Sequence, residues 1–346
     1  MKKILTVVIP TYNMQDYLRR CLDSLIVPEE QMKQLEVLVV NDGSKDSSSA
    51  IAHEYQDKYP DTFRVIDKEN GNYGSCVNRG LKEATGKYFR ILDADDWFDN
   101  VELKKFVQSL NYIPSVDVVF TNYTIIKSDS KQKTVLPRVL KYNVMQSTEI
   151  LSLKKDADML RMHSMTYHTS LLREICLSLQ TGISYTDIEY CYFPYKAAQT
   201  CIAININLYH YWTARDGQTM SPQSIVKKFD DFYAVSSRII KDFVTNAGNM
   251  SIPKQETLVK ILRNPLYFLF LINLVLLRDV PNTQKYKLEK LKSLYKNCNL
   301  ISREVSAFTY RKVPFVKLYA FLPFKLSCIL GIRSVSYTHL TLPTNR

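Results

Sequence analysis

The stretch that decides the fold is Lys87-Tyr-Phe-Arg-Ile-Leu-Asp-Ala-Asp-Asp-Trp97, in which a short, largely apolar run ends in a group of carboxylates. The run predicts a buried strand over 87–92. In open parallel sheets, the residues that bind ligands lie at the carboxyl ends of the strands. The stretch therefore predicts a strand that delivers Asp93, Asp95 and Asp96 to the functional edge of a sheet.

Three earlier apolar runs end in the same way. Residues 5–9, 35–40 and 63–66 predict strands, helical patterns separate them, and a further helix precedes a fifth strand at 116–120. The polar groups that follow the first three strands are Thr11-Tyr12-Asn13, Asn41-Asp42 and Asn70. Strict alternation predicts an α/β fold, with a mostly parallel sheet and helices on both faces. Four strands with polar ends at one edge are a stronger signal than any single motif.

The alternation stops after about residue 130, and the predicted domain organisation follows from this change. We expect a helix at 186–198, a strand at 201–211 and a long helix at 221–244. This organisation gives an α/β domain at 1–220 and a helical, basic extension at 221–333. Residues 334–346 have neither a helical nor a strand period and resemble translated adapter sequence, so we predict a non-native tail there.

Composition narrows the class of protein. The chain has 346 residues, 46% of them hydrophobic and 23% charged, which predicts a sizeable buried core rather than disorder. Its Cys count of 7 is odd, and no pair has the C-x-x-C spacing. This pattern argues against a disulfide framework and a Cys zinc site. The apolar run that starts at Ile4 ends at Pro10, too short for a signal-peptide core, so we expect a cytoplasmic protein.

Positive charge is concentrated near the end of the chain. The formal net charge is +12, and most of it lies between Arg278 and Arg333. In 304–333 cations alternate with aromatic residues, a composition that suits peripheral binding to an anionic membrane on its inner face. Nucleic acid is the rival partner, but no DNA- or RNA-binding signature accompanies the segment, and we predict none. A helix that packs on the rest of the protein with a solvated basic face fits the same pattern.

The carboxylates Asp93, Asp95 and Asp96 indicate a metal site. Neighbouring carboxylates repel one another, and a divalent cation with oxygen ligands removes that repulsion. A solvated acidic turn is the alternative, and the position after a buried strand favours the metal. Asp42 fits hydrogen bonding to a base or ribose and also an ordinary turn. The loop that starts at Asn70 fits phosphate binding at a helix start and also a simple cap.

Four segments together resemble family 2 glycosyltransferases. They are Thr6–Asn13, Val39–Asp46, Asn70–Gly80 and Gly86–Trp97, and they occur in the family's order within about residues 4–125. The resemblance implies a GT-A fold, in which 1–125 form the nucleotide-sugar half and 126–220 the acceptor half. It also implies a nucleotide-sugar donor, commonly a UDP-sugar, a divalent metal such as Mn²⁺ or Mg²⁺, and transfer with inversion at the anomeric carbon.

The resemblance also assigns donor-side residues. It implies that Pro10, Tyr12 and Asn13 line the nucleotide pocket with Tyr12 stacked on the base, that Asp42 reads the base, and that Asn70, Gly74 and Asn78 shape the donor pocket. Asp93 and Asp95 match the D-x-D motif, with Asp95 the first choice as metal ligand and Asp96 the second. Asn41 departs from the family pattern, where many members carry Asp. Arg215 resembles a basic residue of a loop that reaches the pyrophosphate.

The catalytic base is expected in the second half. Inverting transfer needs a carboxylate that accepts the proton of the acceptor hydroxyl. Family members often place it in a Glu-Asp pair, and here Thr186-Asp187 occupies that place, with Thr186 instead of Glu. Asp187 is therefore the predicted base and Glu189 the second choice, while helix capping is the alternative role for Asp187. His163, His168 and His210 fit acceptor-side groups and also ordinary structural roles.

The predicted function is metal-dependent transfer of a sugar to a saccharide or lipid-linked acceptor during the synthesis of a surface polysaccharide. A nucleotidyltransferase would need a Gly-rich phosphate loop with Lys or Arg after the first strand, where this chain has Tyr12-Asn13-Met14-Gln15. A scaffold that binds nucleotide-sugar without catalysis is the other alternative. The intact carboxylate group favours the enzyme.

Overall fold

The computed structural model describes residues 2–127, 132–135, 145–146, 160–213, 226–271 and 282–309. The chain divides into two compact units, Met1–Asp216 and Gly217–Arg346. Arg215, the predicted boundary at 220, residues 310–333 of the basic segment and the predicted tail at 334–346 lie outside the described residues.

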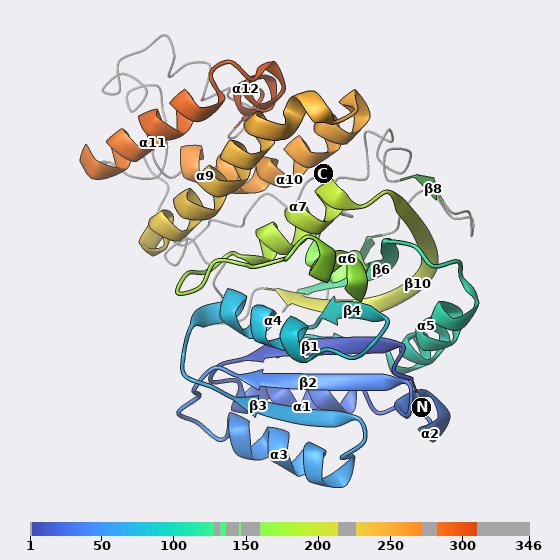
Figure 1. Cartoon of the computed structure of the whole chain (residues 1–346). Coiled ribbons are helices and arrows are strands. Elements are labelled where there is room, and N and C mark those ends of the chain that lie inside the picture. The colour runs from blue at the N-terminus through green and yellow to red at the C-terminus, as the bar shows by residue number, and fades with distance from the viewer. Residues whose placement is uncertain are drawn as a thin grey trace. The chain divides into compact units, whose positions relative to one another are not determined.

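A single sheet organises unit 1, in the order β3-β2-β1-β4-β9-β6-β10-β5 (Figure 1). Strands β1 to β4 are parallel to one another, and β6 is parallel to β10. The strands are β1 (Leu5–Thr11), β2 (Leu35–Asn41), β3 (Phe63–Asp67), β4 (Tyr88–Ile91), β5 (Trp97–Phe98), β6 (Val118–Lys127), β9 (Met165–His168) and β10 (Thr200–Thr213), with β7 (Gln132–Val135) beside β6 and β8 (Met145–Gln146) beside β10. The α/β class and the mostly parallel sheet are confirmed.

Helices follow the strands of unit 1 as the alternation predicted. They are α1 (Gln15–Asp23), α2 (Glu29–Met32), α3 (Ser48–Lys58), α4 (Asn72–Glu83), α5 (Asn100–Tyr112), α6 (Thr169–Glu174) and α7 (Asp187–Ala197), with a 3₁₀ turn, η2, at Met162–Ser164. Close packing depends on small residues, since a Cβ on Gly80 of α4 would collide with the Val8 side chain of β1. Val8 is fully buried in β1, which pairs with β2 on one side and with β4 on the other.

The fifth strand differs from its prediction in length and in partner. The sequence predicted a strand at 116–120, but β6 runs from Val118 to Lys127 because it pairs with β10 along most of its length. The antiparallel strand β9 lies between β4 and β6, where Tyr167 pairs with Phe89 on one side and Val118 on the other. A strand as short as Met165–His168 carries too little period to be found from the sequence.

A buried guanidinium connects these three strands. Arg90 of β4 is fully buried and donates hydrogen bonds to Thr121 Oγ1 of β6 (3.0 Å) and to Thr166 Oγ1 of β9 (2.8 Å). It also donates to the carbonyl oxygen of His163 in η2. Burial lowers the pKa of Arg90 to about 10, which leaves the side chain charged at neutral pH.

Unit 2 is helical in its described part. It contains α9 (Phe229–Asn246), the 3₁₀ turn η3 (Ala247–Asn249), α10 (Ile252–Leu271), α11 (Asn282–Tyr295) and α12 (Asn299–Ser306). Helix α9 contacts α10 and α11, and α10 contacts α12, so apolar faces of all four are buried. Among the helices that the structure describes, none has both the length and the apolar character needed to cross a bilayer.

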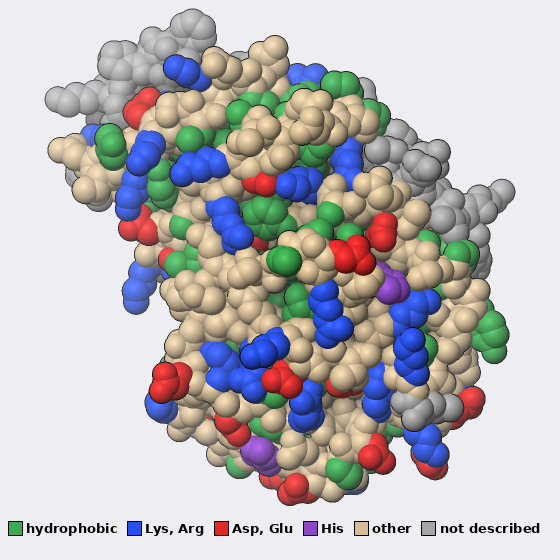
Figure 2. All heavy atoms as spheres, in the orientation of Figure 1, with side chains coloured by type: hydrophobic (Ala, Val, Ile, Leu, Met, Phe, Trp, Pro, Cys, Tyr) green, Lys and Arg blue, Asp and Glu red, His purple; other side chains and the backbone are tan. Residues whose placement is uncertain are grey.

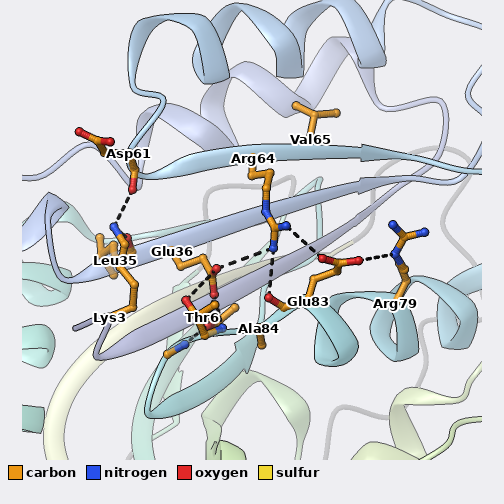
Figure 3. Close-up of polar contacts among 12 residues, drawn as sticks. Lys3, Thr6, Leu35, Glu36, Asp61, Arg64, Val65, Arg79, Glu83 and Ala84 are labelled. Atoms are coloured by element: carbon orange, nitrogen blue, oxygen red, sulfur yellow. Dashed lines mark hydrogen bonds and ion pairs between the residues drawn. The ribbon is translucent and has the colours of Figure 1, made fainter. Parts of the chain in front are cut away.

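A polar network closes the amino end of the sheet in unit 1. The Glu36 side chain of β2 is buried, with 8% of the residue exposed, and lies between Thr6 and Arg64 (Figure 3). Its carboxylate accepts hydrogen bonds from Thr6 Oγ1 (2.6 Å), Thr85 N–H (2.7 Å) and Thr85 Oγ1 (2.9 Å). This one side chain therefore satisfies donors from β1 and from the turn before β4.

We expect Glu36→Ala to lower the free energy of unfolding by about 2–3 kcal/mol, because it leaves buried donors without an acceptor. Urea unfolding followed by circular dichroism measures the change. Glu30→Ala is the matched control, since Glu30 is exposed, and it should leave the unfolding free energy nearly unchanged. Equal effects of the two substitutions would contradict the role given to Glu36.

Candidate active site

Two carboxylates lie side by side after β4. Asp96 is only 1% exposed, and its carboxylate accepts hydrogen bonds from Tyr209 Oη (2.6 Å) and from Trp212 N–H (2.8 Å). Asp93 accepts a hydrogen bond from Tyr73 Oη (2.9 Å). Burial raises the pKa of Asp96 well above its ordinary value, and the charges of Asp95 and Asp93 raise it further. The pair is therefore costly to keep ionised unless a cation lies nearby.

His163 completes this group from the other half of the sheet. One ring nitrogen of His163 and one oxygen each of Asp93 and Asp96 all lie within 4.8 Å of one another. His163 is 8% exposed, and its Nδ1 has no hydrogen-bond partner within the described residues. Burial lowers the pKa of His163 well below its ordinary value, as do the charges of Arg161 and Arg90, so the ring is neutral at pH 7.

The donor set suits a divalent cation. Carboxylate oxygens suit Mg²⁺ and Mn²⁺, and a neutral imidazole adds a ligand that many transition metals accept. Tyrosine rings hold the imidazole in place, with Tyr123 stacked at 5.3 Å and Tyr211 at 4.2 Å between ring centroids. The unpartnered nitrogen and the paired acids together fit a metal that bridges the two halves of unit 1.

Asp95, the first-choice metal ligand from the sequence, lies outside this group. Its carbonyl oxygen accepts a hydrogen bond from the Arg20 guanidinium (2.8 Å), which lies between the rings of Trp97 (3.9 Å) and Trp212 (4.4 Å). The structure thus favours Asp93 and Asp96 as ligands, and a ligand role for Asp95 stays a prediction.

The predicted base begins α7 near the carboxylate pair. Burial raises the pKa of Asp187 to about 6, while hydrogen bonds from its own and Ile188 backbone N–H groups and the charge of Arg161 act in the opposite direction. The pKa of Tyr73 is raised by burial and by the charges of Asp93 and Asp187. Tyr73 therefore lies under the influence of both the predicted base and a metal-ligand candidate.

Glu189, the second choice as base, has a different environment. It is fully buried, and its carboxylate accepts hydrogen bonds from Gln180 N–H (2.8 Å) and Gln180 Nε2 (2.7 Å). These bonds fix the segment that precedes α7. The geometry favours Asp187 as the base because Glu189 is occupied in holding that segment.

Asp42 lies at the end of β2, where it also stabilises the start of α4. Its carboxylate accepts hydrogen bonds from Gly71 N–H (2.9 Å) and Asn72 N–H (2.9 Å) and forms an ion pair with Lys68. Asn70 Nδ2 donates to the Asp42 carbonyl oxygen (3.0 Å). Lys68 was missed by the sequence reading, because its pairing with Asp42 depends on how β2 and β3 lie in register. Base reading by Asp42 stays a prediction.

The loop after β1 carries an exposed aromatic ring. Tyr12 is 45% exposed, which leaves its ring accessible, and Pro10 is partly buried in β1. Asn13 has a positive φ of 53°, and its side-chain oxygen accepts a hydrogen bond from Lys45 N–H (2.8 Å). Asn13 N–H donates to Ser44 Oγ (3.0 Å), so this loop is tied to the loop after β2. Their roles in nucleotide binding stay predictions.

Gly74 and Asn78 join α4 to the segment that leads into α7. The Asn78 side chain exchanges two hydrogen bonds with the backbone of Leu179, both at 2.8 Å. A Cβ on Gly74 would collide with the carbonyl oxygen of Gln180. These two residues therefore let α4 pack closely against the segment that leads into α7, and their contact with a donor stays a prediction.

Comparison with known proteins agrees with this site. Residues 6–176 match the family model described as "Glycosyl transferase family 2". The chain therefore contains a family 2 glycosyltransferase domain, as the four motifs implied.

Individual relatives match over the first part of the chain. A Mycoplasma genitalium protein named "Uncharacterized glycosyltransferase MG025" is 33% identical over 138 residues, which are 39% of this chain and 45% of that protein. "Glycosyltransferase GlyA" of Streptococcus pneumoniae is 37% identical over 123 residues, 34% of this chain and 16% of that protein. The matches thus span less than half of either relative.

A solved structure has the same fold. The crystal structure of S. aureus TarS 1-349 in complex with UDP-GlcNAc has a TM-score of 0.54 and 17% sequence identity, and the match covers 89% of this chain and 93% of that one. At this identity the likeness concerns the fold alone, and it confirms the GT-A fold with a helical C-terminal region.

We expect Gly74→Ala to destabilise the protein by about 2 kcal/mol or more, because the added methyl would force α4 away from the backbone of Gln180. Urea unfolding measures the loss. Gly248→Ala is the control, since a Cβ there meets nothing within 4 Å, and it should be neutral. A Gly74→Ala protein as stable as the control protein would contradict the packing described.

Proposed function

We propose that this protein transfers a sugar from a nucleotide-sugar donor, such as a UDP-sugar, to a saccharide or lipid-linked acceptor. One observation carries the proposal. Within a family 2 domain, the side chains of Asp93, Asp96 and His163 lie close together, beside Tyr73 and the predicted base. A nucleotidyltransferase is not favoured, because the loop after β1 is tied by Asn13 and Ser44 and offers no cation to a phosphate.

Asp93, Asp96 and His163 would hold the divalent metal. When bound, Mn²⁺ or Mg²⁺ neutralises charge on the departing diphosphate of the donor. The protein keeps these three ligands ready through Tyr73, Tyr209 and the tyrosine rings around His163. Holding them in place in the absence of ligand reduces the reorganisation needed when the diphosphate leaves.

Asp187 would accept the proton of the acceptor hydroxyl as it attacks the anomeric carbon, with inversion there. A pKa of about 6 leaves most Asp187 side chains ionised at pH 7.5, yet makes the carboxylate a stronger base than an exposed Asp. The nearby charge of Arg161, from the same turn as His163, limits this rise in pKa. We place the acceptor hydroxyl on this side of the site.

The donor would lie along the loops after β1, β2 and β3. The exposed Tyr12 ring offers a stacking surface for the base, and the Asp42–Lys68 pair offers hydrogen-bonding groups at the same edge of the sheet. Arg215 is our proposed contact to the pyrophosphate. Surface-polysaccharide synthesis at the inner face of the membrane is the proposed setting, with the basic segment 304–333 as the membrane contact.

We expect His163→Gln and Asp93→Asn each to weaken Mn²⁺ binding by about tenfold or more, since each removes one of the three ligands. Titration of the protein with Mn²⁺ in the absence of donor measures this affinity by calorimetry. Release of free nucleotide from a panel of nucleotide-sugars should fall in parallel and should be lost with a chelator.

His210→Gln is the matched control, because this ring packs against Trp97 and lies outside the metal-binding group. It should bind Mn²⁺ like the unaltered protein. Chelator-insensitive transfer that is unchanged in Asp93→Asn would contradict the metal site. Donor binding without transfer to any acceptor would instead support the scaffold alternative.

We expect Asp187→Asn to abolish most transfer and the unaltered protein to lose kcat/KM as the pH falls through about 6, where the carboxylate becomes protonated. A pH profile of transfer with the best acceptor checks this. Because the pKa is raised from 3.8 to about 6 in the folded state, the carboxylate lowers stability progressively as the pH rises between these two values and in full above about 6. Asp187→Asn should therefore be no less stable at pH 7.5.

Asp99→Asn separates catalysis from helix capping. Asp99 caps α5 and accepts a hydrogen bond from Glu102 N–H (2.9 Å), remote in sequence from the predicted base. It should keep full activity. If Asp187→Asn also kept full activity, Asp187 would be a helix-capping residue and not the base.

A further inference from the structure

Unit 1 has a cavity of about 370 Å³ that none of the roles above uses. Most of its lining residues lie in three places. Gly86 and Lys87 precede β4, His168 ends β9, and Arg173 and Glu174 end α6. Lys2, before β1, also lines it. We refer to this hollow as the amino-end cavity.

The amino-end cavity is separate from the candidate active site. Lys87 lies just before the first residue of β4, and Asp93 lies after the last. The four residues of β4, at about 3.3 Å each, put about 13 Å of strand between them. A ligand in this cavity would therefore bind at the opposite end of the strands from the carboxylate pair.

The charged residues that line this cavity are mostly positive. Lys2, Lys87 and Arg173 contribute three cations against the single carboxylate of Glu174. None of these three cations forms an ion pair with any residue that the structure describes. Over the part of unit 1 where Figure 1 places β4 and α6, Figure 2 shows a His with Lys and Arg side chains on one side and Asp or Glu side chains on the other. The excess charge favours an anionic ligand.

The cationic groups are held in place rather than free to spread apart. The Arg173 guanidinium donates to the carbonyl oxygen of Ala84 (2.6 Å). This hydrogen bond holds one side of the guanidinium group in place. The Lys87 ammonium lies 5.2 Å from the centroid of the Tyr88 ring, close enough for a cation–π contact. Both groups therefore keep their positions near the cavity without a ligand, which reduces the entropy lost on binding.

His168 adds a neutral hydrogen-bond donor. Its Nδ1 accepts a hydrogen bond from Ser170 N–H (3.3 Å), so in the neutral ring Nε2 carries the proton. Burial and the charge of Lys87 lower the pKa of His168, while Asp117 and Glu174 act in the opposite direction. The carboxylate of Asp117 accepts hydrogen bonds from the backbone N–H groups of Gln199 and Thr200 and so is directed toward β10.

We propose that the amino-end cavity binds a phosphate group, with Arg173 and Lys87 as its main contacts and Lys2 and His168 Nε2–H as further donors. A guanidinium fork matches the oxygens of phosphate, and the local excess of positive charge matches a dianion. The cavity lies at the small end of the usual range for ligand sites, which suits a phosphate and the small group that carries it.

Two arms of one experiment distinguish a soluble phosphate ester from a lipid headgroup. In the first, the full chain is titrated with inorganic phosphate and with glycerol 1-phosphate at constant ionic strength, and binding is measured by calorimetry. In the second, it is sedimented with phosphatidylcholine vesicles that contain or lack phosphatidic acid. Neither arm contains a donor or an acceptor sugar, so the outcome is independent of the proposed transferase activity.

The test variant is Lys87→Gln with Arg173→Gln. The matched control is Lys58→Gln with Lys104→Gln, which removes the same charge, and Lys58 also lies 5.2 Å from the centroid of a neighbouring ring, that of Tyr59. We expect the test variant to bind phosphate about tenfold or more weakly and the control to bind normally. Circular dichroism verifies that both variants fold.

Loss in both arms supports a phosphate site open to either source, and loss in the vesicle arm alone assigns the site to a lipid headgroup. Loss in the titration alone assigns it to a soluble ester. The proposal is overturned if the unaltered protein shows no saturable phosphate binding in either arm. It is also overturned if the test and control variants weaken binding equally, because the effect would then reflect net charge.

Discussion

The repulsion between Asp93 and Asp96 is the constraint on which the rest of the candidate site depends. Two carboxylates held together beside a neutral imidazole need fixed donors, and these come from distant parts of the chain. Tyr73 opens α4, while Tyr209 and Trp212 lie near the end of β10. The length of β10 therefore has a direct chemical consequence, since a shorter strand would leave the Asp96 carboxylate buried without two of its donors.

The buried side chain of Arg90 is a second constraint on the candidate site. Arg90 lies on β4, three positions before Asp93, which follows the strand, and it donates to the carbonyl oxygen of His163. One strand thus positions a carboxylate directly and fixes the turn that presents the imidazole. The cost of burying a guanidinium is offset by hydrogen bonds to Thr121 and Thr166, which join the parallel half of the sheet to β9 and β6. The candidate metal-binding group is in this sense built on a cross-strand hydrogen-bond network.

The sequence predicted what local patterns encode. Apolar runs followed by polar residues predicted β1, β2, β3 and β4 and the edge where Asp42 and Asp93 lie. It did not predict β9, because a four-residue strand has no usable period. It named His163 only as a possible acceptor-side group and not as a neighbour of Asp93, because that approach depends on β9. It ranked Asp95 above Asp93, since neighbouring acids look equivalent until burial and hydrogen bonding separate them. Lys68 was not predicted either, because its partner Asp42 follows a different strand and the pairing depends on how the two strands lie side by side.

The two ends of the strands perform different tasks, and the packing explains how. At the amino end, the Glu36 carboxylate accepts hydrogen bonds from Thr6 and Thr85 and pairs with Arg64, and it is not among the residues that line the amino-end cavity. At the carboxyl end, acids accumulate and are held by tyrosine hydroxyls that carry no charge. The residues that line the amino-end cavity and those around the carboxylate pair therefore differ in the sign of their net charge. A donor diphosphate with its metal would bind at the acidic edge, while a phosphate without a metal is attracted to the opposite one.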